Sequence, residues 1–322
     1  MTAIDIPRNV ATTARATAPL IHIGYHKTGT TFLQKRVFGN PESGFACPWG
    51  QQPPEVVQRF ILCNAFSFDP GAARAPFDRG LQEAARGGRV PVMSHEQLSG
   101  HPIGGTYETK EIADRLHATF PEARILIGIR EQKAMILSFY RQAIRKGHAM
   151  SLSELIGTGQ EPAGWAPRLR LEHLAFHHAV SYYQGLFGPE RVLVLPMELL
   201  KQDQAEYVAR IARFTGLQAP DLEVRKPENV GWLGFALAVR RRLNLLVPRR
   251  QLGGPYCRRW YIAWKITDLV NAAAPRKLHQ AFDDRLRAQI AQRVGDFYRD
   301  SNRELEHRAG LDLGGFGYDV GA

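Results

Sequence analysis

Hydrophobic residues form short, uninterrupted runs rich in Ile, Val and Leu along the chain as far as residue 196. Four such runs lie at 20–24, 89–93, 123–129 and 191–196. Runs of this length, bounded by Pro, Gly or charged residues, are typical of strands that are buried on both faces. We therefore predict four buried strands.

Between these runs, apolar residues recur at helical spacing. The first run is followed by a segment in which Phe32, Leu33, Val37 and Phe38 repeat at this spacing, and Gly39 and Pro41 then end the pattern. Such a pattern predicts a helix over 30–38. Further helices are predicted near 54–66, 106–119, 133–147 and 169–187. Because strands and helices alternate, we predict an α/β fold with a parallel sheet that helices cover on both faces.

After residue 196 the strand pattern stops and only helical patterns follow. They lie near 203–215, 232–246, 256–271 and 280–308. Proline and glycine interrupt them, and the Pro/Gly-bounded segment from about 220 to 273 is expected to form a mobile helical lid or subdomain. The expected organisation is a disordered leader, 1–18, and one domain, 19–322, into which this lid is inserted.

The composition is that of a water-soluble globular protein. The 322 residues are 44% hydrophobic and 23% charged, so disordered, fibrous and membrane-spanning classes are disfavoured. The first eighteen residues lack the apolar core of a signal peptide, and we expect a cytoplasmic protein. Three scattered cysteines, Cys47, Cys63 and Cys257, are too few for a disulfide framework and are expected to be reduced.

The charge balance points to an anionic partner. The chain carries a formal net charge of +11. Such an excess is typical of proteins that bind nucleic acid, a membrane surface or a phosphorylated small molecule. Residues 225–260 hold nine basic residues against one acid, a net charge of +8. This basic region leaves three readings open: a solvated surface, contacts to ligand phosphates, and peripheral contact with an acidic partner or a membrane.

The segment Gly24-Tyr25-His26-Lys27-Thr28-Gly29-Thr30-Thr31 lies between the first predicted strand and its helix. A turn there exposes backbone N–H groups at a helix N-terminus, where the helix dipole favours an anion. Gly29 lets the backbone approach a phosphate closely, and Lys27 supplies a positive charge. The pattern therefore predicts an anion-binding loop.

This loop differs from the nucleotide triphosphatase pattern G-x-x-x-x-G-K-[ST], because Lys27 precedes the second glycine. It resembles instead the 5′-phosphosulfate loop of the PAPS-dependent sulfotransferases, whose K-T-G-T-T core is matched by Lys27 to Thr31. The resemblance implies a P-loop-type fold and the cofactor 3′-phosphoadenosine 5′-phosphosulfate (PAPS), without a metal. It also implies that Tyr25 to Thr31 hold the phosphosulfate and that Lys27 stabilises charge on the bridging oxygen as the sulfuryl group leaves.

A second motif agrees with this resemblance. Arg130 follows the predicted strand 123–129, and Ser138 comes eight residues later on the next helix. The family's 3′-phosphate motif places an arginine and a serine at this spacing. A guanidinium fork can bind phosphate oxygens, and a hydroxyl can donate a further hydrogen bond. Arg130 and Ser138 are therefore expected to hold the 3′ phosphate. The stretch 297–318 is a weaker likeness to the closing helix and tail of bacterial family members.

Transfer to a hydroxyl needs a base, and two candidates follow the predicted strand 89–93. His95 and Glu96 come directly after Ser94, at the carboxyl end of that strand, where open α/β sheets bind ligands. In carbohydrate-type members of the family a glutamate in this segment is the base, and in cytosolic small-molecule members a histidine is. The late glycine-rich segment of the small-molecule branch is absent here. The chain therefore resembles the carbohydrate-type branch more closely, and we prefer Glu96 over His95.

Three classes of function compete at this stage. The preferred one is a PAPS-dependent sulfotransferase that acts on a hydroxyl of a small-molecule, saccharide or lipid-linked acceptor. A P-loop kinase or nucleotide hydrolase is opposed by the position of Lys27 and by the lack of a magnesium-binding Asp after a strand. A basic nucleic-acid-binding protein is opposed by the lack of a known module signature, so no nucleic-acid partner is expected. The sequence does not choose the acceptor or the oligomeric state.

Overall fold

The computed structural model describes residues 18–105, 107–220, 231–247 and 257–321. The expected leader, 1–18, therefore lies almost wholly outside the described residues. So do parts of the basic region, including Arg225, Lys226, Arg249 and Arg250.

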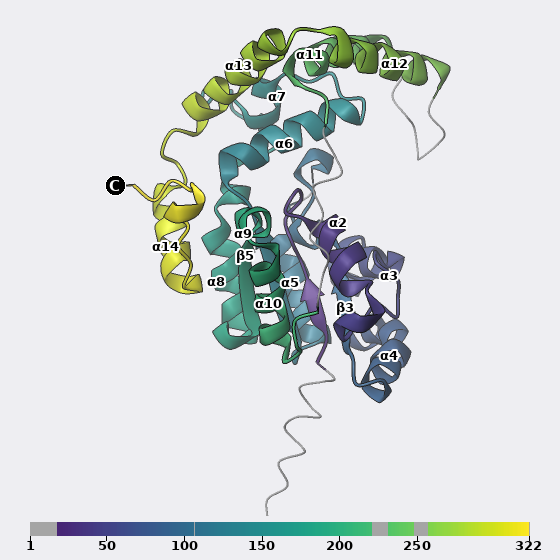
Figure 1. The fold of residues 1–322 in the computed structure, drawn as a ribbon. Coiled ribbons are helices and arrows are strands. Elements are labelled where there is room, and N and C mark those ends of the chain that lie inside the picture. The colour runs from purple at the N-terminus through teal and green to yellow at the C-terminus, as the bar shows by residue number, and fades with distance from the viewer. Residues whose placement is uncertain (1–17, 106, 221–230, 248–256, 322) are drawn as a thin grey trace, which may run out of the picture.

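A five-stranded parallel sheet lies at the centre of the molecule (Figure 1). Its strands, in chain order, are β1 (Leu20–His22), β2 (Phe45–Ala46), β3 (Val90–Ser94), β4 (Arg124–Ile129) and β5 (Val192–Pro196). In space the order is β2-β3-β1-β4-β5. The central strand β1 pairs with β3 on one side and with β4 on the other, so that Ile21 lies between Met93 and Ile125.

Helices cover both faces of this sheet, as predicted. Alternate side chains of β4 belong to two different cores: Ile125, Ile127 and Ile129 to one, and Leu126 to the other. The first core includes residues of α4 (Pro70–Arg86), α5 (Thr109–Thr119), α8 (Phe176–Phe187) and α14 (Arg299–Ala309). The second is formed with the π-helical turn Leu33–Phe38, α9 (Met197–Gln202) and α10 (Gln204–Thr215). The predicted fold class is therefore confirmed.

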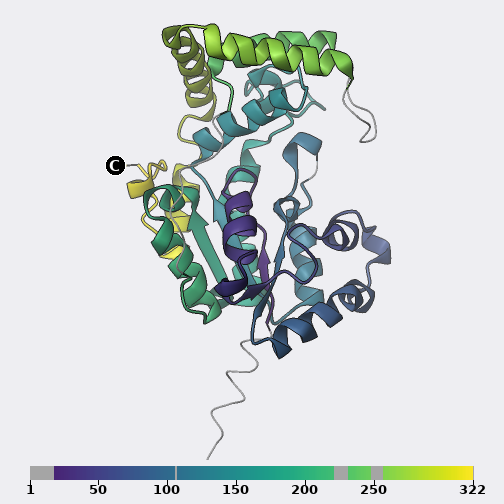
Figure 2. The same ribbon diagram turned by 45° about the vertical axis from the view of Figure 1, so that its right-hand side comes forward.

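A separate group of helices lies beyond the carboxyl edge of the sheet (Figures 1 and 2). It consists of α6 (Gln132–Arg145), α7 (Leu152–Ile156), α11 (Gly234–Leu243), α12 (Arg258–Ala273) and α13 (Arg276–Val294). Helix α11 packs against α6, α12 and α13. Arg141 of α6 is joined to Asp283 of α13 by an ion pair with an N–O distance of 2.6 Å. The helices between 231 and 273 thus form one layer with α6 and α13.

Strand β2 and helices α4, α7 and α9 were not predicted from the sequence. Strand β2 has only two residues, too few to show any pattern. Helix α4 contains Pro70, Gly71, Pro76 and Gly80, residues that normally argue against a helix. Pro70 stands in the first turn, where its missing N–H costs nothing, and the Asp69 side chain caps that turn. These N-terminal contacts and a buried apolar face offset the destabilising effect of the proline and glycine residues.

The predicted boundaries also needed correction. The predicted helix 280–308 is two helices, α13 and α14, because Gly295 takes a backbone φ of 52° that ends α13. The predicted helix 54–66 is reduced to α3 (Pro54–Val56) and the π-helical turn Val57–Ile61. The strand predicted over 20–24 ends at His22, although Ile23 still donates a hydrogen bond to Leu126.

Candidate active site at the carboxyl edge of the sheet

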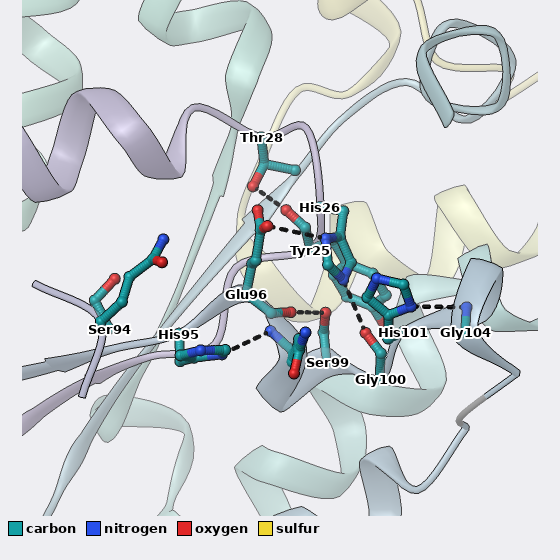
Figure 3. A network of polar contacts seen from close by, with 12 residues as sticks. Tyr25, His26, Thr28, Ser94, His95, Glu96, Ser99, Gly100, His101 and Gly104 are labelled. Carbon is teal, nitrogen blue, oxygen red and sulfur yellow. Dashed lines mark hydrogen bonds and ion pairs between the residues drawn. The ribbon is translucent and has the colours of Figure 1, made fainter. Parts of the chain in front are cut away.

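The loop after β1 is fastened to the end of β4. The Tyr25 backbone N–H donates to the Gly128 carbonyl at 3.1 Å, which continues the β1–β4 ladder. A Cβ at Gly128 would lie 2.9 Å from the Thr28 hydroxyl, so glycine is needed for the loop to lie this close. The Thr28 hydroxyl itself donates to the Tyr25 carbonyl, which closes the turn (Figure 3).

The backbone of this loop is held in an unusual conformation. Lys27 has a φ of 71°, and within the described ranges it is the only residue other than glycine with a positive φ. Gly29 has a φ of 89° and is the N-cap of α2 (Thr30–Phe32). Left-handed residues of this kind turn successive N–H groups toward one concave side, a geometry that binds anions. Such strain is commonly found at functional sites.

Tyr25 does not bring its side chain into the site. Its ring is 2% exposed and packs edge-on against Phe176 and His173, with centroid distances of 4.8 and 5.4 Å. Only its backbone belongs to the loop. Thr31, by contrast, is exposed in the first turn of α2.

Arg130 follows β4 and contacts the loop. Its Nη1 donates to the Lys27 carbonyl at 3.4 Å, which joins the two motifs that the sequence places about a hundred residues apart. The Arg130 Nε is buried and has no hydrogen-bond partner among the described residues, and neither has the Thr30 hydroxyl. Buried polar groups are normally paired, so these two groups can bind an acceptor from outside the chain.

Ser138 lies in the second turn of α6 and is half-buried. Helix α6 starts directly after Arg130, because the Glu131 side chain accepts hydrogen bonds from the N–H groups of Lys133 and Ala134. The chain thus places Arg130 at the strand end and Ser138 on the helix that follows, as the sequence predicted.

Glu96 lies in the turn that follows β3 and faces the loop after β1. Its Oε1 is 3.3 Å from the Nδ1 of His26. The other ring nitrogen of His26, Nε2, lies 3.2 Å from the Gly100 carbonyl oxygen. Figure 3 shows the imidazole between these two oxygens. His26 is 3% exposed, whereas the Glu96 side chain is 34% exposed and open to a substrate.

The two contacts of His26 constrain its hydrogen bonding. A carbonyl oxygen only accepts hydrogen bonds, so Nε2 carries a hydrogen toward Gly100. The contact to Glu96 then needs one further proton, either on Nδ1 or on the carboxyl group. The hydrogen bond from His26 is the main cause that lowers the pKa of Glu96, against the opposing effect of burial.

His95 makes a different contact. Its Nδ1 accepts a hydrogen bond from the Gln97 N–H at 3.3 Å and so caps the 3₁₀ turn Glu96–Ser99. In Figure 3 its dashed contact goes to the following turn and not to the His26–Glu96 pair. Burial lowers its pKa. The two candidate bases thus differ: Glu96 faces the loop, and His95 holds the turn that carries Glu96.

Positive charge gathers around Lys27. Burial lowers the pKa of its ammonium group, and the nearby charges of Arg130, Arg145 and Lys146 lower it further, against the opposing effect of Glu96. Positive charges gathered around a partly buried ammonium group in this way favour the binding of an anion. The sequence motifs did not identify Arg145 and Lys146, which lie at the C-terminal end of α6 and beyond it.

Two further networks were not identified from the sequence. Glu198 of α9 accepts from the Glu131 N–H at 3.3 Å and from the Tyr318 hydroxyl at 3.1 Å, and its charge acts on Arg130. Under the loop, the Ser94 hydroxyl lies 2.8 Å from the His22 Nδ1 and accepts from Gln34 at 3.1 Å. All these contacts join segments that are distant in the sequence, so no local pattern could predict them.

Within the parts of the chain that the structure describes, no group of three or more His, Cys, Asp or Glu side chains is arranged to hold a metal ion. In the same parts, no helix combines the length and the apolar character that are needed to cross a membrane.

Comparison with known proteins identifies the family. The profile of a sulfotransferase domain matches residues 18–229. No curated protein sequence matches the chain. The structure is similar to a sulfotransferase from Alicyclobacillus acidocaldarius, with a TM-score of 0.54 and 15% identity over 93% of this chain and 98% of that one. A sulfotransferase domain from the Synechococcus PCC 7002 olefin synthase gives a TM-score of 0.40 and 15% identity, over 78% of this chain and 94% of that one. Since the profile covers more than half of its length, the chain belongs to the sulfotransferase domain family.

Proposed function

We propose that this protein transfers a sulfuryl group from PAPS to a hydroxyl of a small-molecule, saccharide or lipid-linked acceptor, with Glu96 as the general base. The observation that carries the proposal is the meeting of a basic anion-binding loop with a partly exposed carboxylate at one edge of the sheet. Family membership supports the transfer of a sulfuryl group.

The residues present fit PAPS as the donor. The unpaired Arg130 Nε and Thr30 hydroxyl offer hydrogen bonds to phosphate oxygens. Lys27 and its neighbouring cations offer charge to the phosphosulfate. When bound, PAPS supplies the activated sulfuryl group. We assign its 5′ end to the loop Tyr25–Thr31 and its 3′ phosphate to Arg130 and Ser138.

Glu96 accepts the acceptor's proton in this proposal. As the acceptor oxygen forms its bond to sulfur, its hydroxyl proton passes to the carboxylate, and the bond from sulfur to the bridging oxygen breaks. Lys27 stabilises the negative charge that develops on that oxygen. The contact from His26 fixes one carboxylate oxygen, so the other stays available to the acceptor. The products are a sulfate ester of the acceptor and adenosine 3′,5′-bisphosphate.

The alternative of a P-loop kinase or nucleotide hydrolase makes an opposite prediction about metal. We expect adenosine 3′,5′-bisphosphate to raise the melting temperature of the purified protein in EDTA. The binding free energy appears as added stability, about 2.7 kcal/mol at a hundredfold excess over Kd. Equal or greater stabilisation by Mg-ATP would favour the kinase.

Acceptor profiling tests the transfer itself. Purified protein, PAPS and pools of saccharides, lipid-linked alcohols and small alcohols are incubated, and mass spectrometry follows the gain of one sulfuryl group together with release of the bisphosphate. The Glu96→Gln protein serves as the matched control. Release of bisphosphate without any sulfated product in all pools would contradict transfer to a hydroxyl.

A further inference from the structure

Helix α12 has an inner face that is packed against the protein. Trp264 packs against Trp232 and Trp260 with tilted rings, at centroid distances of 4.4 and 4.8 Å. Ala263 and Thr267 are buried on the same side. The Asp268 carboxylate accepts a hydrogen bond from the Trp232 Nε1 at 2.7 Å. The helix is thus firmly seated on the rest of the protein along one side.

The outer face of α12 is also apolar, although it is exposed. Tyr261 is 53% exposed, Ile262 48%, Ile266 41% and Leu269 69%. Ile262, Ile266 and Leu269 follow one another at intervals of four and three residues, so they form one stripe along the helix. A stripe of large apolar side chains is unusual on the exposed side of a surface helix.

The stripe continues into a neighbouring turn. Leu245 and Leu246 are 73% and 70% exposed in the 3₁₀ turn Asn244–Leu246, which contacts α12. We refer to six residues together as the α12 patch: Leu245, Leu246, Tyr261, Ile262, Ile266 and Leu269. Of the ten large hydrophobic side chains that are exposed in the described parts of the chain, six lie in this patch. Such concentration marks an interaction surface.

The surroundings of the patch are almost purely basic. Arg258 and Lys265 each lie four residues before a member of the stripe and so share its side of the helix. Asp268 is the only acid in 231–247 and 257–280, and it is already bound to Trp232. The exposed basic side chains of these ranges are Arg242, Arg258, Arg259, Lys265, Arg276 and Lys277.

A binding partner of this surface has to match both its apolar side chains and its positive charges. A second copy of the chain would bring two sets of like charges together, which opposes association. A nucleic acid offers phosphates but leaves the apolar stripe in water. A bilayer with anionic headgroups satisfies both, because its interface takes up apolar side chains and its surface charge attracts Lys and Arg.

We propose that the α12 patch binds the surface of an anionic lipid bilayer, with α12 lying in the plane of the interface. Figures 1 and 2 show α12 at the outermost edge of the molecule, on the far side of the helical layer from the sheet. Contact there keeps the helical layer between the lipid and the sheet edge that carries the site. Tyr261 and Trp260 stand near the start of the helix, and such aromatic rings favour the headgroup region.

Co-sedimentation with vesicles tests the proposal with the full chain. We expect binding to mixed phosphatidylcholine and phosphatidylglycerol vesicles, weak binding to phosphatidylcholine alone, and weakening by salt. The variant R258Q/R259Q/K265Q should lower the partition coefficient by about fivefold per charge removed. I262S/I266S/L269S should lower it by at least about tenfold.

Control variants carry fewer changes of the same kind in the region around α4. F66S removes a fully exposed aromatic residue elsewhere, and R86Q/R89Q neutralises two exposed arginines near the start of β3. Both should bind vesicles like the unaltered protein. Melting temperatures of all variants, measured without lipid, show whether each one is folded.

Three outcomes would overturn the proposal. The first is equal sedimentation with neutral and anionic vesicles, and the second is undiminished binding of a folded patch variant. The third is a dimer, seen by light scattering, that I262S/I266S/L269S dissociates, because the occupant would then be a second copy. None of these measurements uses PAPS or an acceptor, so their failure leaves the proposed sulfuryl transfer standing.

Discussion

The His26 imidazole joins the anion-binding loop to the carboxylate of Glu96, with 3.3 Å between Nδ1 and Oε1. The loop follows β1 and the carboxylate follows β3, and these two strands are adjacent in the sheet. A histidine inside the loop after β1 therefore orients the carboxylate that follows β3.

The substitution Glu96→Gln tests the base. It keeps the shape of the side chain and removes its ability to accept a proton as a carboxylate. We expect kcat to fall by about a hundredfold to ten-thousandfold, while the affinity for adenosine 3′,5′-bisphosphate stays close to normal. Steady-state assays measure kcat, and titration calorimetry measures the affinity for the bisphosphate. His95→Asn is the control and should be milder, and the reverse ranking would move the base to His95.

The substitution His26→Asn tests the positioning role of the imidazole. The hydrogen bond from His26 lowers the pKa of Glu96, so its removal should raise that pKa. Because the base must be ionised, the acidic limb of the kcat/KM profile should move to higher pH. A purely structural role would lower activity at every pH without moving this limb, and that result would contradict the prediction.

Substitutions of Lys27 and of Arg130 should change different kinetic parameters. Lys27→Ala removes charge that acts on the leaving oxygen, so it should mainly lower kcat. Arg130→Ala removes a contact to the remote 3′ phosphate, so it should mainly raise KM for PAPS. Hydrogen bonds between charged groups contribute about 1.5 to 3 kcal/mol, which corresponds to about tenfold to a hundredfold in affinity. Unchanged bisphosphate affinity of Arg130→Ala would refute the 3′ assignment.

His22 predicts how stability depends on pH. Burial lowers its pKa to about 4, so the folded state keeps the ring neutral while the unfolded chain binds a proton below about pH 6.5. Stability is therefore complete above that pH and is lost as the pH falls from about 6.5 to about 4. At pH 5 the loss from this one group is about 2 kcal/mol.

Urea unfolding midpoints at pH 7.5 and pH 5 measure this effect. The difference between the two midpoints should shrink in His22→Asn and stay unchanged in His307→Gln, which alters an exposed histidine. Equal pH dependence in both variants would show that His22 is not the titrating group.

Much of the sheet could be predicted because four of its strands are continuous apolar runs. The position of the site followed from the same pattern, since parallel strands bring their carboxyl ends to one edge. The motif residues Lys27, Glu96 and Arg130 do follow β1, β3 and β4 in the structure. Local pattern and topology were sufficient for this much.

The remaining features depend on contacts between distant segments. Helix α4 holds two prolines in its sequence and is stabilised by packing: a Cβ at Gly80 would lie 2.5 Å from Trp49 Nε1. His26 interacts with Glu96, and Glu198 acts on Arg130, but the sequence does not show that these residues lie close together. No spacing rule links positions that only the folded chain brings together.

The order of the strands has a consequence for how such a protein can diversify. Strand β1 lies between β3, which precedes Glu96, and β4, which precedes Arg130. The proposed contacts to the hydroxyl compound and to the nucleotide therefore come from opposite flanks of one strand. Substitutions in the segment after β3 can alter which compound is modified. The segment after β4 can meanwhile keep its contacts with a common donor. An ancestral donor site could in this way be retained while the range of acceptors changed.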